Sequence, residues 1–495
     1  MGLDRVRAAR AAGTRAKLTR ARSTAASKLK AVDGNRLKPC SGRPSGLYGV
    51  LESEGKTEIP AKTEGLKSPA WGVLAVFAAV AVPGVFIRGR FADQWDEATY
   101  HYPTILKFAS TLPHPDLTRY QSGTGPLFHL IMAMLVRAGF GLLSLRLINL
   151  GLSATTLILV MLYLKRHAAC ASGASVCIVT LVFALCPYLL GPSIRLATDN
   201  LALGCAVAIL YLLDDTRPAS AGVFLLAVVL AVIAVLTRQL YLWLVPLLLA
   251  YAACNAAWNG IRKAIAIAAS LTPCLAIAPL FIAWHGLIPP DFAERTSLNN
   301  RLFNEKALIL VVCISGLYAL VFAPQLTMVL RPLNRRARLM LLGVVGLSLI
   351  CLPILKAKAG DYIVPTEGGW LRALAERTPA FLGVWSLFWV LFPIGWVVIC
   401  AIGYHVLQTR TGYWLLAGFA LWLAFNLLQG RAMAKYYEPF EIIVLGRFAV
   451  EASPSNPWST APALCMAAAF VVIDIARFWL SAPWAVPGLS QLAPG

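Results

Sequence analysis

The sequence predicts an all-α integral membrane protein that crosses the bilayer with about 12–13 transmembrane helices. Of its 495 residues, 58% are hydrophobic and only 14% are charged, and the mean hydropathy is +0.69. Apolar runs of about 17 to 25 residues, enough to cross a hydrocarbon core of about 30 Å, recur from Trp71 nearly to the C-terminus. A segment in lipid must satisfy its own backbone hydrogen bonds, so these runs are expected to be helices. A water-soluble protein is excluded, because so few charges could not cover its surface.

The N-terminal segment 1–68 differs from the rest of the chain in composition. It holds 15 of the 44 basic residues beside six acidic ones, and it has few large apolar residues. Such a segment cannot build a core, so it is expected to be a disordered cytoplasmic tail drawn to anionic lipid headgroups. An Arg-rich transit peptide and a misassigned start are the alternatives. Because the net charge of +21 is distributed so unevenly, it does not indicate nucleic-acid binding.

The apolar runs and the basic connections between them fix an expected topology. Residues 126–140 form a short run that contains His129 and Arg137, which favours a helix lying at the membrane interface. With this run not crossing, Lys165-Arg166, Arg262-Lys263 and the Arg cluster at 331–338 fall on the cytoplasmic side, as the positive-inside rule requires. The expected spans lie near 71–87, 144–164, 173–190, 199–213, 220–236, 239–257, 264–284, 307–330, 339–355, 380–404, 412–428, 437–449 and 461–482.

This topology divides the chain into the tail 1–68, a transmembrane module 69–285 and a variable C-terminal module 286–495. The first module carries the long external loop 88–143, and the second carries external loops 285–306 and 356–379. Every expected external segment contains ionisable side chains. We therefore expect the chemistry of the protein on its non-cytoplasmic face.

The most informative segment follows the first expected span. Asp96 and Glu97 are adjacent carboxylates between aromatic residues typical of headgroup depth, where a substrate carried by a lipid would present its reactive group. A solvated helix cap is the alternative interpretation of these acids. His101 follows them, and an interfacial hydrogen bond is the alternative to ligand binding there. The topology also puts Asp199, Arg238 with Gln239, and Arg431 with Lys435 on the same face.

Several short motifs occur in order along the chain. They are Asp96-Glu97, Tyr100-His101-Tyr-Pro103, Asp116, Thr124-Gly-Pro-Leu-Phe128, Arg146-Leu-Ile-Asn149, Ala197-Thr-Asp199, Thr237-Arg238-Gln239 with Trp243, and Arg431-Ala-Met-Ala-Lys435-Tyr-Tyr437-Glu-Pro439. This series resembles the GT-C superfamily of polyprenyl-phosphate-sugar-dependent glycosyltransferases. Within it, the motifs are most similar to the dolichyl-phosphate-glucose α-1,2-glucosyltransferase family of lipid-linked oligosaccharide assembly. One residue more than in that family separates Asp96-Glu97 from His101.

The resemblance implies a GT-C-like helical bundle that moves a hexose, glucose-like by resemblance, from a polyprenyl- or dolichyl-phosphate donor to a glycan or glycolipid acceptor. It also implies substrate binding by His101, Asp116, Asp199, Arg238, Gln239, Arg431, Lys435 and Tyr437. Glycosyl transfer needs a base for the acceptor hydroxyl and cations for the leaving phosphate. We expect Asp96 to be the general base of a single inverting displacement, with Glu97 orienting the acceptor or its neighbours. Arg238, Arg431 and Lys435 are the candidate phosphate contacts, and interfacial snorkelling is the alternative for each.

No cofactor is expected, although a divalent metal stays open. The eleven cysteines are scattered without ligand spacing, and Asp93, Asp96, Glu97 and His101 match no standard metal motif. A secondary transporter or lipid-glycan flippase is the alternative function, but its expected pair of similar halves is missing from the sequence. The Ala-, Arg-, Gly- and Pro-rich composition favours a bacterial inner membrane, with the endoplasmic reticulum membrane as the alternative.

Overall fold

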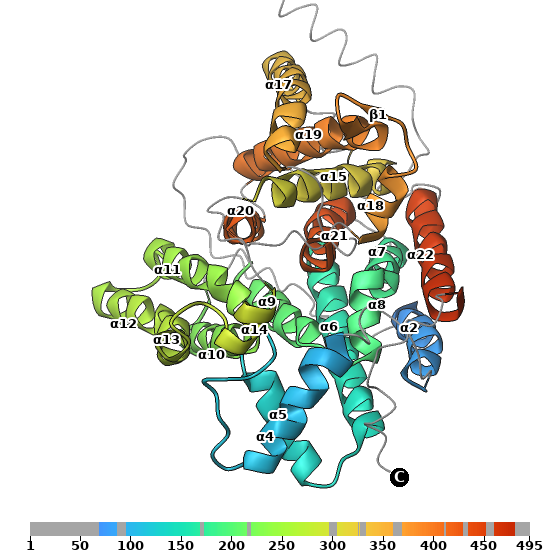
Figure 1. Cartoon of the computed structure of the whole chain (residues 1–495). Coiled ribbons are helices and arrows are strands. Elements are labelled where there is room, and N and C mark those ends of the chain that lie inside the picture. Colours follow the sequence, from blue (N-terminus) through green and yellow to red (C-terminus); the bar gives the residue numbers. More distant parts are fainter. Residues whose placement is uncertain are drawn as a thin grey trace, which may run out of the picture. The chain divides into compact units, whose positions relative to one another are not determined.

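The computed structural model of the chain is built almost entirely of helices (Figure 1). It describes residues 69–86, 96–168, 173–214, 219–296, 304–324, 326, 333–359, 369–409, 412–428, 434–451 and 460–480. All of them belong to one unit that begins at Glu64. The expected cytoplasmic tail, 1–68, lies outside the described residues.

The first expected external loop contains three helical segments after α2 (Pro69–Phe86): η1 (Glu97–His101), α4 (Tyr102–Thr111) and α5 (Leu127–Arg137). The 11 residues of α5 give a length of about 16 Å, roughly half of the hydrocarbon core of about 30 Å. This helix packs on α4, burying Phe128 and Met132 while Met134 stays exposed. A straight helix of this length does not cross the core by itself, and the placement of residues 126–140 at the interface stays a prediction.

The next part of the chain supplies the helices that position the site. They are α6 (Leu142–His167), α7 (Gly173–Leu185), α8 (Pro187–Ile194), α9 (Asp199–Leu213), α10 (Ala221–Thr237), η2 (Gln239–Trp243), α11 (Leu244–Cys254), α12 (Gly260–Ser270) and α13 (Thr272–Trp284). The helices α7 and α8 bend by 60° at Cys186. Pro187 follows that residue, and because proline has no N–H it cannot continue the hydrogen-bond ladder of α7.

The C-terminal part adds α14 (Pro290–Thr296), α15 (Glu305–Val321), α17 (Arg335–Ala359), α18 (Gly369–Ala375), α19 (Ser386–Thr409), α20 (Tyr413–Leu427), α21 (Ala434–Glu451) and α22 (Ala461–Leu480). Helix α21 packs against α6, α7, α8 and α15 (Figure 1). Nearly all of its side chains are buried. It therefore joins the two halves of the chain. Helices α15 and α19 cross closely at Gly316 and Gly395, where an added Cβ would lie 2.0 Å and 1.9 Å from a backbone oxygen of the other helix.

One expected span begins later than predicted. The span 380–404 was expected to start at Ala380, but residues 380–385 form the two-stranded hairpin of β1 (Ala380–Phe381) and β2 (Val384–Trp385). Leu382 and Gly383 between the strands have φ values of 50° and 72°. These left-handed conformations do not continue a helix, so α19 starts only at Ser386.

The described residues make a multi-pass helical membrane protein. By length and composition, four helical stretches are able to cross a membrane, at Leu142–His167, Gly260–Trp284, Arg335–Lys356 and Ser386–Leu407, and the bent pair of α7 and α8 is a fifth if it counts as one span. Several of the about 12–13 expected transmembrane helices are therefore shorter than 18 residues in the described chain. Shorter apolar helices of 10–17 residues occupy most of the other expected spans. Their ends are set by prolines and polar residues within the apolar runs.

Candidate active site

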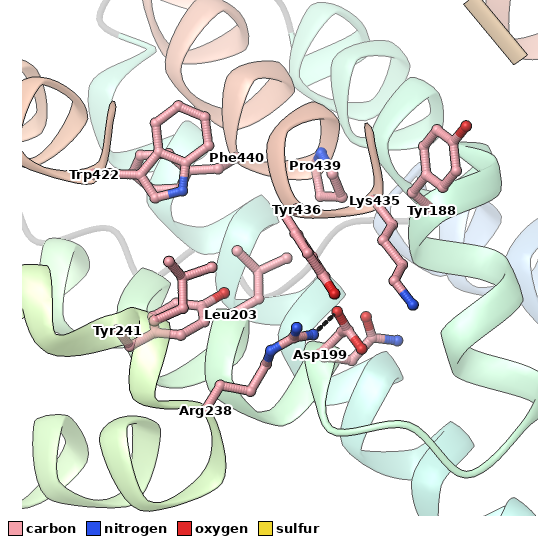
Figure 2. A pocket seen from close by; sticks show the side chains of 12 residues that line it. Tyr188, Asp199, Leu203, Arg238, Tyr241, Trp422, Lys435, Tyr436, Pro439 and Phe440 are labelled. Atoms are coloured by element: carbon pink, nitrogen blue, oxygen red, sulfur yellow. Dashed lines mark hydrogen bonds and ion pairs between the residues drawn. The ribbon is translucent and has the colours of Figure 1, made fainter. Parts of the chain in front are cut away.

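A pocket lies where α8, α9, η2, α20 and α21 meet (Figure 2). Its empty volume is about 390 Å³, open solvent included. Aromatic rings and three charged side chains line it: Tyr188, Asp199, Asn200, Leu203, Arg238, Leu240, Tyr241, Trp422, Lys435, Tyr436, Pro439 and Phe440. The three charged residues are among those singled out in the sequence, and the fold brings them together.

Asp199 and Arg238 form an ion pair in this pocket. Asp199 occupies the first turn of α9, where its charge interacts favourably with the positive end of the helix dipole. Arg238 follows the last residue of α10 in an extended conformation, with φ −145° and ψ 113°, and its Nη1 donates a hydrogen bond to Oδ1 of Asp199. The side chain of Arg238 is 10% exposed and that of Asp199 is 16% exposed. Because both charges are largely desolvated, each depends strongly on the other.

Lys435 and Asp96 form the second ion pair. Lys435 lies in the first turn of α21, and its Nζ donates a 2.6 Å hydrogen bond to Oδ2 of Asp96, the residue that precedes η1. Lys435 lines the pocket, whereas Asp96 is not among the lining residues. Pro439 has no N–H, so the main-chain carbonyl of Lys435 receives no helical hydrogen bond from it.

The ring of Tyr436 lies between the two cations. It is 4.5 Å from Cζ of Arg238 and 5.6 Å from Nζ of Lys435, measured to the ring centroid. Figure 2 shows the side chain reaching down from α21 between them. An aromatic face attracts cations at such distances. Tyr436 therefore holds two positive charges near each other inside one pocket.

Glu97 has a different environment from its neighbour Asp96. Its carboxylate accepts hydrogen bonds from Nε of Arg146 at 2.9 Å, from Nη2 of the same guanidinium, and from the backbone N–H of Leu196 at 3.0 Å. Glu97 is 2% exposed and Arg146 is 8% exposed. This buried, two-pronged pair ties the first loop to α6 and to the segment before α9. Glu97 was predicted to orient either the acceptor or neighbouring residues. Its contacts with Arg146 and Leu196 fit the second role.

Two asparagines complete the polar contacts beneath the pocket. Asn149 donates from Nδ2 to the carbonyl oxygens of Pro192 and Arg195, at 2.7 Å and 2.5 Å. Asn200 donates to Oγ of Ser153 at 2.8 Å and is within 2.9 Å of Oγ of Ser193. Both side chains are at most 1% exposed. They join α6 to the end of α8, which fixes where α9 and Asp199 begin.

The segment between Glu97 and His101 is a π-helix, with the N–H of Tyr102 bonded to the carbonyl of Glu97. A π-helical turn takes up one residue more than an α-helical turn, and such turns are frequent at functional sites. His101 is buried with its Nδ1 3.0 Å from Nε2 of His129. Burial lowers the pKa of His101 to about 3, so the imidazole is neutral near pH 7.

The remaining candidates do not line the pocket. Gln239 donates to the carbonyls of Gly123 and Leu287 at 2.9 Å and 3.1 Å, so it joins two loops. Asp116 is exposed, and hydrogen bonds from Thr118 lower the pKa of its carboxyl. Tyr437 is fully buried beside Trp422. Arg431 lies outside the described residues.

The sequence did not single out the aromatic and amide residues of the pocket, namely Tyr188, Asn200, Tyr241, Trp422, Tyr436 and Phe440. Asn200 and Tyr436 directly follow the charged residues Asp199 and Lys435. Their position in the sequence could have identified these two residues, because polar and aromatic residues next to a charge at the end of an apolar run are typical of the membrane interface. Among the residues the structure describes, no three His, Cys, Asp or Glu side chains gather in a way that could hold a metal ion.

The arrangement combines two carboxylates, two cations and several aromatic rings. Arg and Lys are suited to phosphate oxygens, because charge-assisted hydrogen bonds from them are short and strong. A carboxylate beside them can accept a proton. Aromatic rings such as Tyr188 and Tyr241 add flat apolar surface. The pocket can therefore bind an anion and hold a base close to it.

No family model and no curated protein matches the chain. Among solved structures, the chain is similar to ArnT from Cupriavidus metallidurans bound to undecaprenyl phosphate, with 15% identity, a TM-score of 0.35, and coverage of 77% of this chain and 78% of that one. The apo state of the same protein gives 14% identity, a TM-score of 0.34 and 78% coverage of both chains. The comparisons do not support the narrower resemblance to the dolichyl-phosphate-glucose glucosyltransferases.

Proposed function

We propose that this protein is a membrane glycosyltransferase that uses a polyprenyl-phosphate sugar as donor and a glycan or glycolipid as acceptor. The transfer takes place on the non-cytoplasmic face of the membrane, with the bacterial inner membrane favoured. A hexose is the proposed sugar, and inversion at the anomeric carbon is the proposed outcome. The charged residues of the pocket, of which Asp199, Arg238 and Lys435 also belong to the sequence motifs, support this donor class.

The observation that carries the proposal is the grouping of Asp96, Asp199, Arg238 and Lys435. Asp96 and Lys435 are 339 positions apart in the sequence and yet bonded. Ionisable residues at the ends of membrane helices are costly unless they face water, partners or a ligand. Two paired cations beside aromatic rings form an environment suited to the phosphate of a lipid-borne sugar.

In the proposed reaction, Asp96 takes the proton of the acceptor hydroxyl while the acceptor oxygen bonds to the anomeric carbon. The bond between that carbon and the phosphate oxygen breaks, and its electron pair stays on the phosphate. Arg238 and Lys435 stabilise the charge that accumulates there, the effect expected of cations placed at a leaving group. Glu97 acts through Arg146 to hold the first loop, so it is a positioning residue.

The test is transfer of label by the purified full-length protein from radiolabelled polyprenyl-phosphate hexoses to a lipid or glycan acceptor. Wild type is compared with Asp96→Asn, and with Glu305→Gln as a matched loss of one carboxylate away from the pocket. We expect transfer by wild type and Glu305→Gln and its loss in Asp96→Asn. Equal transfer by Asp96→Asn would refute the assigned base, and no transfer with any donor would refute the function.

A secondary transporter or lipid-glycan flippase is the second candidate, and two features of α21 and α8 favour it. Glu438 and Glu441 are fully buried one turn apart on α21, and intramembrane carboxylates mark ion pathways in many transporters. The α7–α8 pair is bent like the broken helices of transporters. Proteoliposomes that move a labelled lipid-linked sugar across the bilayer without transferring the sugar would favour this function.

A further inference from the structure

The proposed base is engaged by a cation that also faces the pocket. Nζ of Lys435 is 2.6 Å from Oδ2 of Asp96, and both side chains are largely buried, at 20% and 26% exposure. Lys435 lines the pocket and Asp96 does not. The ammonium group of Lys435 therefore occupies a carboxylate oxygen of Asp96. An acceptor hydroxyl can hydrogen-bond to that oxygen only after Lys435 has moved away.

The charges around the pocket balance before any ligand arrives. Asp199 is paired with Arg238, and Asp96 is paired with Lys435. A phosphodiester donor brings one further negative charge into this balanced set. Of the cations that line the described pocket, Arg238 or Lys435 must change its partner to give the phosphate a full ion pair. Lys435 is the better suited of the two, because its flexible four-carbon stem carries a point charge with three donors, and its side chain is twice as exposed as that of Arg238.

We infer that Lys435 is an exchange residue, which pairs with Asp96 in the empty pocket and with the donor phosphate when the donor is bound. This inference rests on the proposed function in taking a lipid phosphate as the ligand. Donor binding then frees Asp96 at the moment when a base is needed. An acceptor that entered an empty pocket would meet a base that is already paired, so the donor must bind first.

The exchange also fits the charge balance of the reaction itself. Breakage of the bond from the anomeric carbon to oxygen leaves the phosphate with one more negative charge, and the acceptor proton neutralises Asp96. After this step the carboxyl needs no cation, whereas the phosphate needs one more than before. Lys435 is then fully available to the leaving phosphate. When the product lipid departs and Asp96 loses its proton to water, the original ion pair is restored.

Affinity for undecaprenyl phosphate tests the exchange without any turnover. The full-length protein in lipid nanodiscs is titrated with this lipid as wild type, Asp96→Asn, Lys435→Met and the double variant. Loss of Lys435 should weaken binding about tenfold or more, the effect of about 1.4 kcal/mol in binding free energy. Asp96→Asn should bind several-fold more tightly than wild type, because its Lys435 is no longer held by a carboxylate. Glu305→Gln is the control for loss of a negative charge elsewhere.

The double variant decides the mechanism. If Asp96 acts through Lys435, the gain from Asp96→Asn disappears in the Lys435→Met background, and the double variant binds like Lys435→Met. A gain that persists there would mean that Asp96 repels the phosphate directly, which overturns the exchange. Wild-type affinity in Asp96→Asn overturns it too. If neither wild type nor any variant binds the lipid, both the exchange and the proposed donor class are overturned. If wild type transfers sugar from the donor but Asp96→Asn does not bind the lipid more tightly than wild type, the exchange alone is overturned.

Discussion

Lys435 donates a 2.6 Å hydrogen bond to Asp96, so the first turn of α21 is joined to the start of the first-loop helices. This contact brings a residue from the last third of the chain to the acidic pair near its beginning. The pocket consequently depends on segments from both halves of the protein. Changes at either end of this ion pair should therefore alter both the chemistry of the pocket and the contact between the two segments.

Asp96→Asn should lower sugar transfer by about 10²- to 10⁴-fold, the usual contribution of a general base. The amide keeps the shape of the side chain but cannot take a proton. Initial rates with a radiolabelled polyprenyl-phosphate hexose measure this loss. Asp96→Glu should keep part of the activity, because it preserves the carboxylate. A glutamate variant as inactive as the asparagine variant, or an asparagine variant as active as wild type, would contradict the assignment.

Arg238 should affect both donor binding and stability, and the two effects can be separated. Arg238→Met removes a phosphate contact and leaves the largely buried carboxylate of Asp199 without its Arg238 partner, so we expect weaker donor binding and a lower melting temperature. Loss of one partner of a buried ion pair costs about 3–5 kcal/mol. Adding Asp199→Asn should restore most of the stability. The KM for the donor should stay high in the double variant, because the phosphate contact is still missing. A return of KM to the wild-type value would show that Arg238 is only structural.

Much of the helical framework could be predicted from hydropathy, because each apolar run is long and its ends carry polar residues or prolines. The start of α9 at Asp199 and the end of α10 at Thr237 agree with the expected spans to within a residue. The apolar run at 173–190 was expected to be one span, but it forms the two helices α7 and α8. Its composition suits one span, but Pro187 bends it by 60°, which the hydropathy profile does not register.

The candidate site was predictable only in part. The sequence motifs selected Asp199, Arg238 and Lys435, and the expected topology put all three on one membrane face, which restricts which charges can meet. Topology does not specify pairs, so the contact of Lys435 with Asp96 could not be foreseen. The same limit applies to Gln239. A motif selected this residue, but its side chain donates hydrogen bonds to loop carbonyls outside the pocket.

Glu97→Gln should destabilise the protein by about 3–5 kcal/mol, because it removes one charge of a buried ion pair. Arg146 would keep its buried positive charge, and the N–H of Leu196 would have a weaker acceptor. Thermal unfolding of the purified protein measures the change. Glu376→Gln is the matched control, since its partner Arg372 lies one helical turn away and Glu376 is 42% exposed. Such a surface pair is worth about 0–1 kcal/mol, and similar melting temperatures for the two variants would contradict the structural role of Glu97.

Gly369→Ala should destabilise the contact of α18 with α8. Gly369 has a φ of 56°, and an added Cβ would lie 1.3 Å from the hydroxyl oxygen of Tyr188. Trp370, the next residue, donates from its N–H to that hydroxyl at 2.9 Å and from its indole to Glu438 at 2.9 Å. The methyl group would displace both contacts.

The matched control for that change is Gly343→Ala, which lies in α17 with open space around its Cα. Alanine is favoured over glycine inside a helix by about 1 kcal/mol, so this variant should unfold at the same or a higher temperature than wild type. Gly369→Ala should unfold at a lower one. Equal melting temperatures for the two variants would mean that α18 does not depend on its close approach to Tyr188.

The histidine pair should make stability depend on pH. Burial lowers the pKa of His101 to about 3 and that of His129 well below its usual 6.5. In the unfolded chain both titrate near 6.5, so below that pH the unfolded state binds more protons than the folded one. The stability that the neutral pair provides is therefore complete above about pH 6.5 and is lost as the pH falls below it, by about 1.4 kcal/mol per pH unit for each histidine that stays neutral. For His101 this loss continues to about pH 3.

The double variant His101→Asn/His129→Leu isolates this effect from the titration of carboxylates, which both proteins share. We expect the melting temperature of wild type to fall more steeply between pH 6.5 and pH 4.5 than that of the double variant, because only wild type must bury two groups that are protonated when unfolded. His114→Asn is the control, since His114 is exposed in the loop after α4, and it should keep the wild-type slope. Equal slopes for wild type and the double variant would show that the buried pair does not stay neutral in the folded protein.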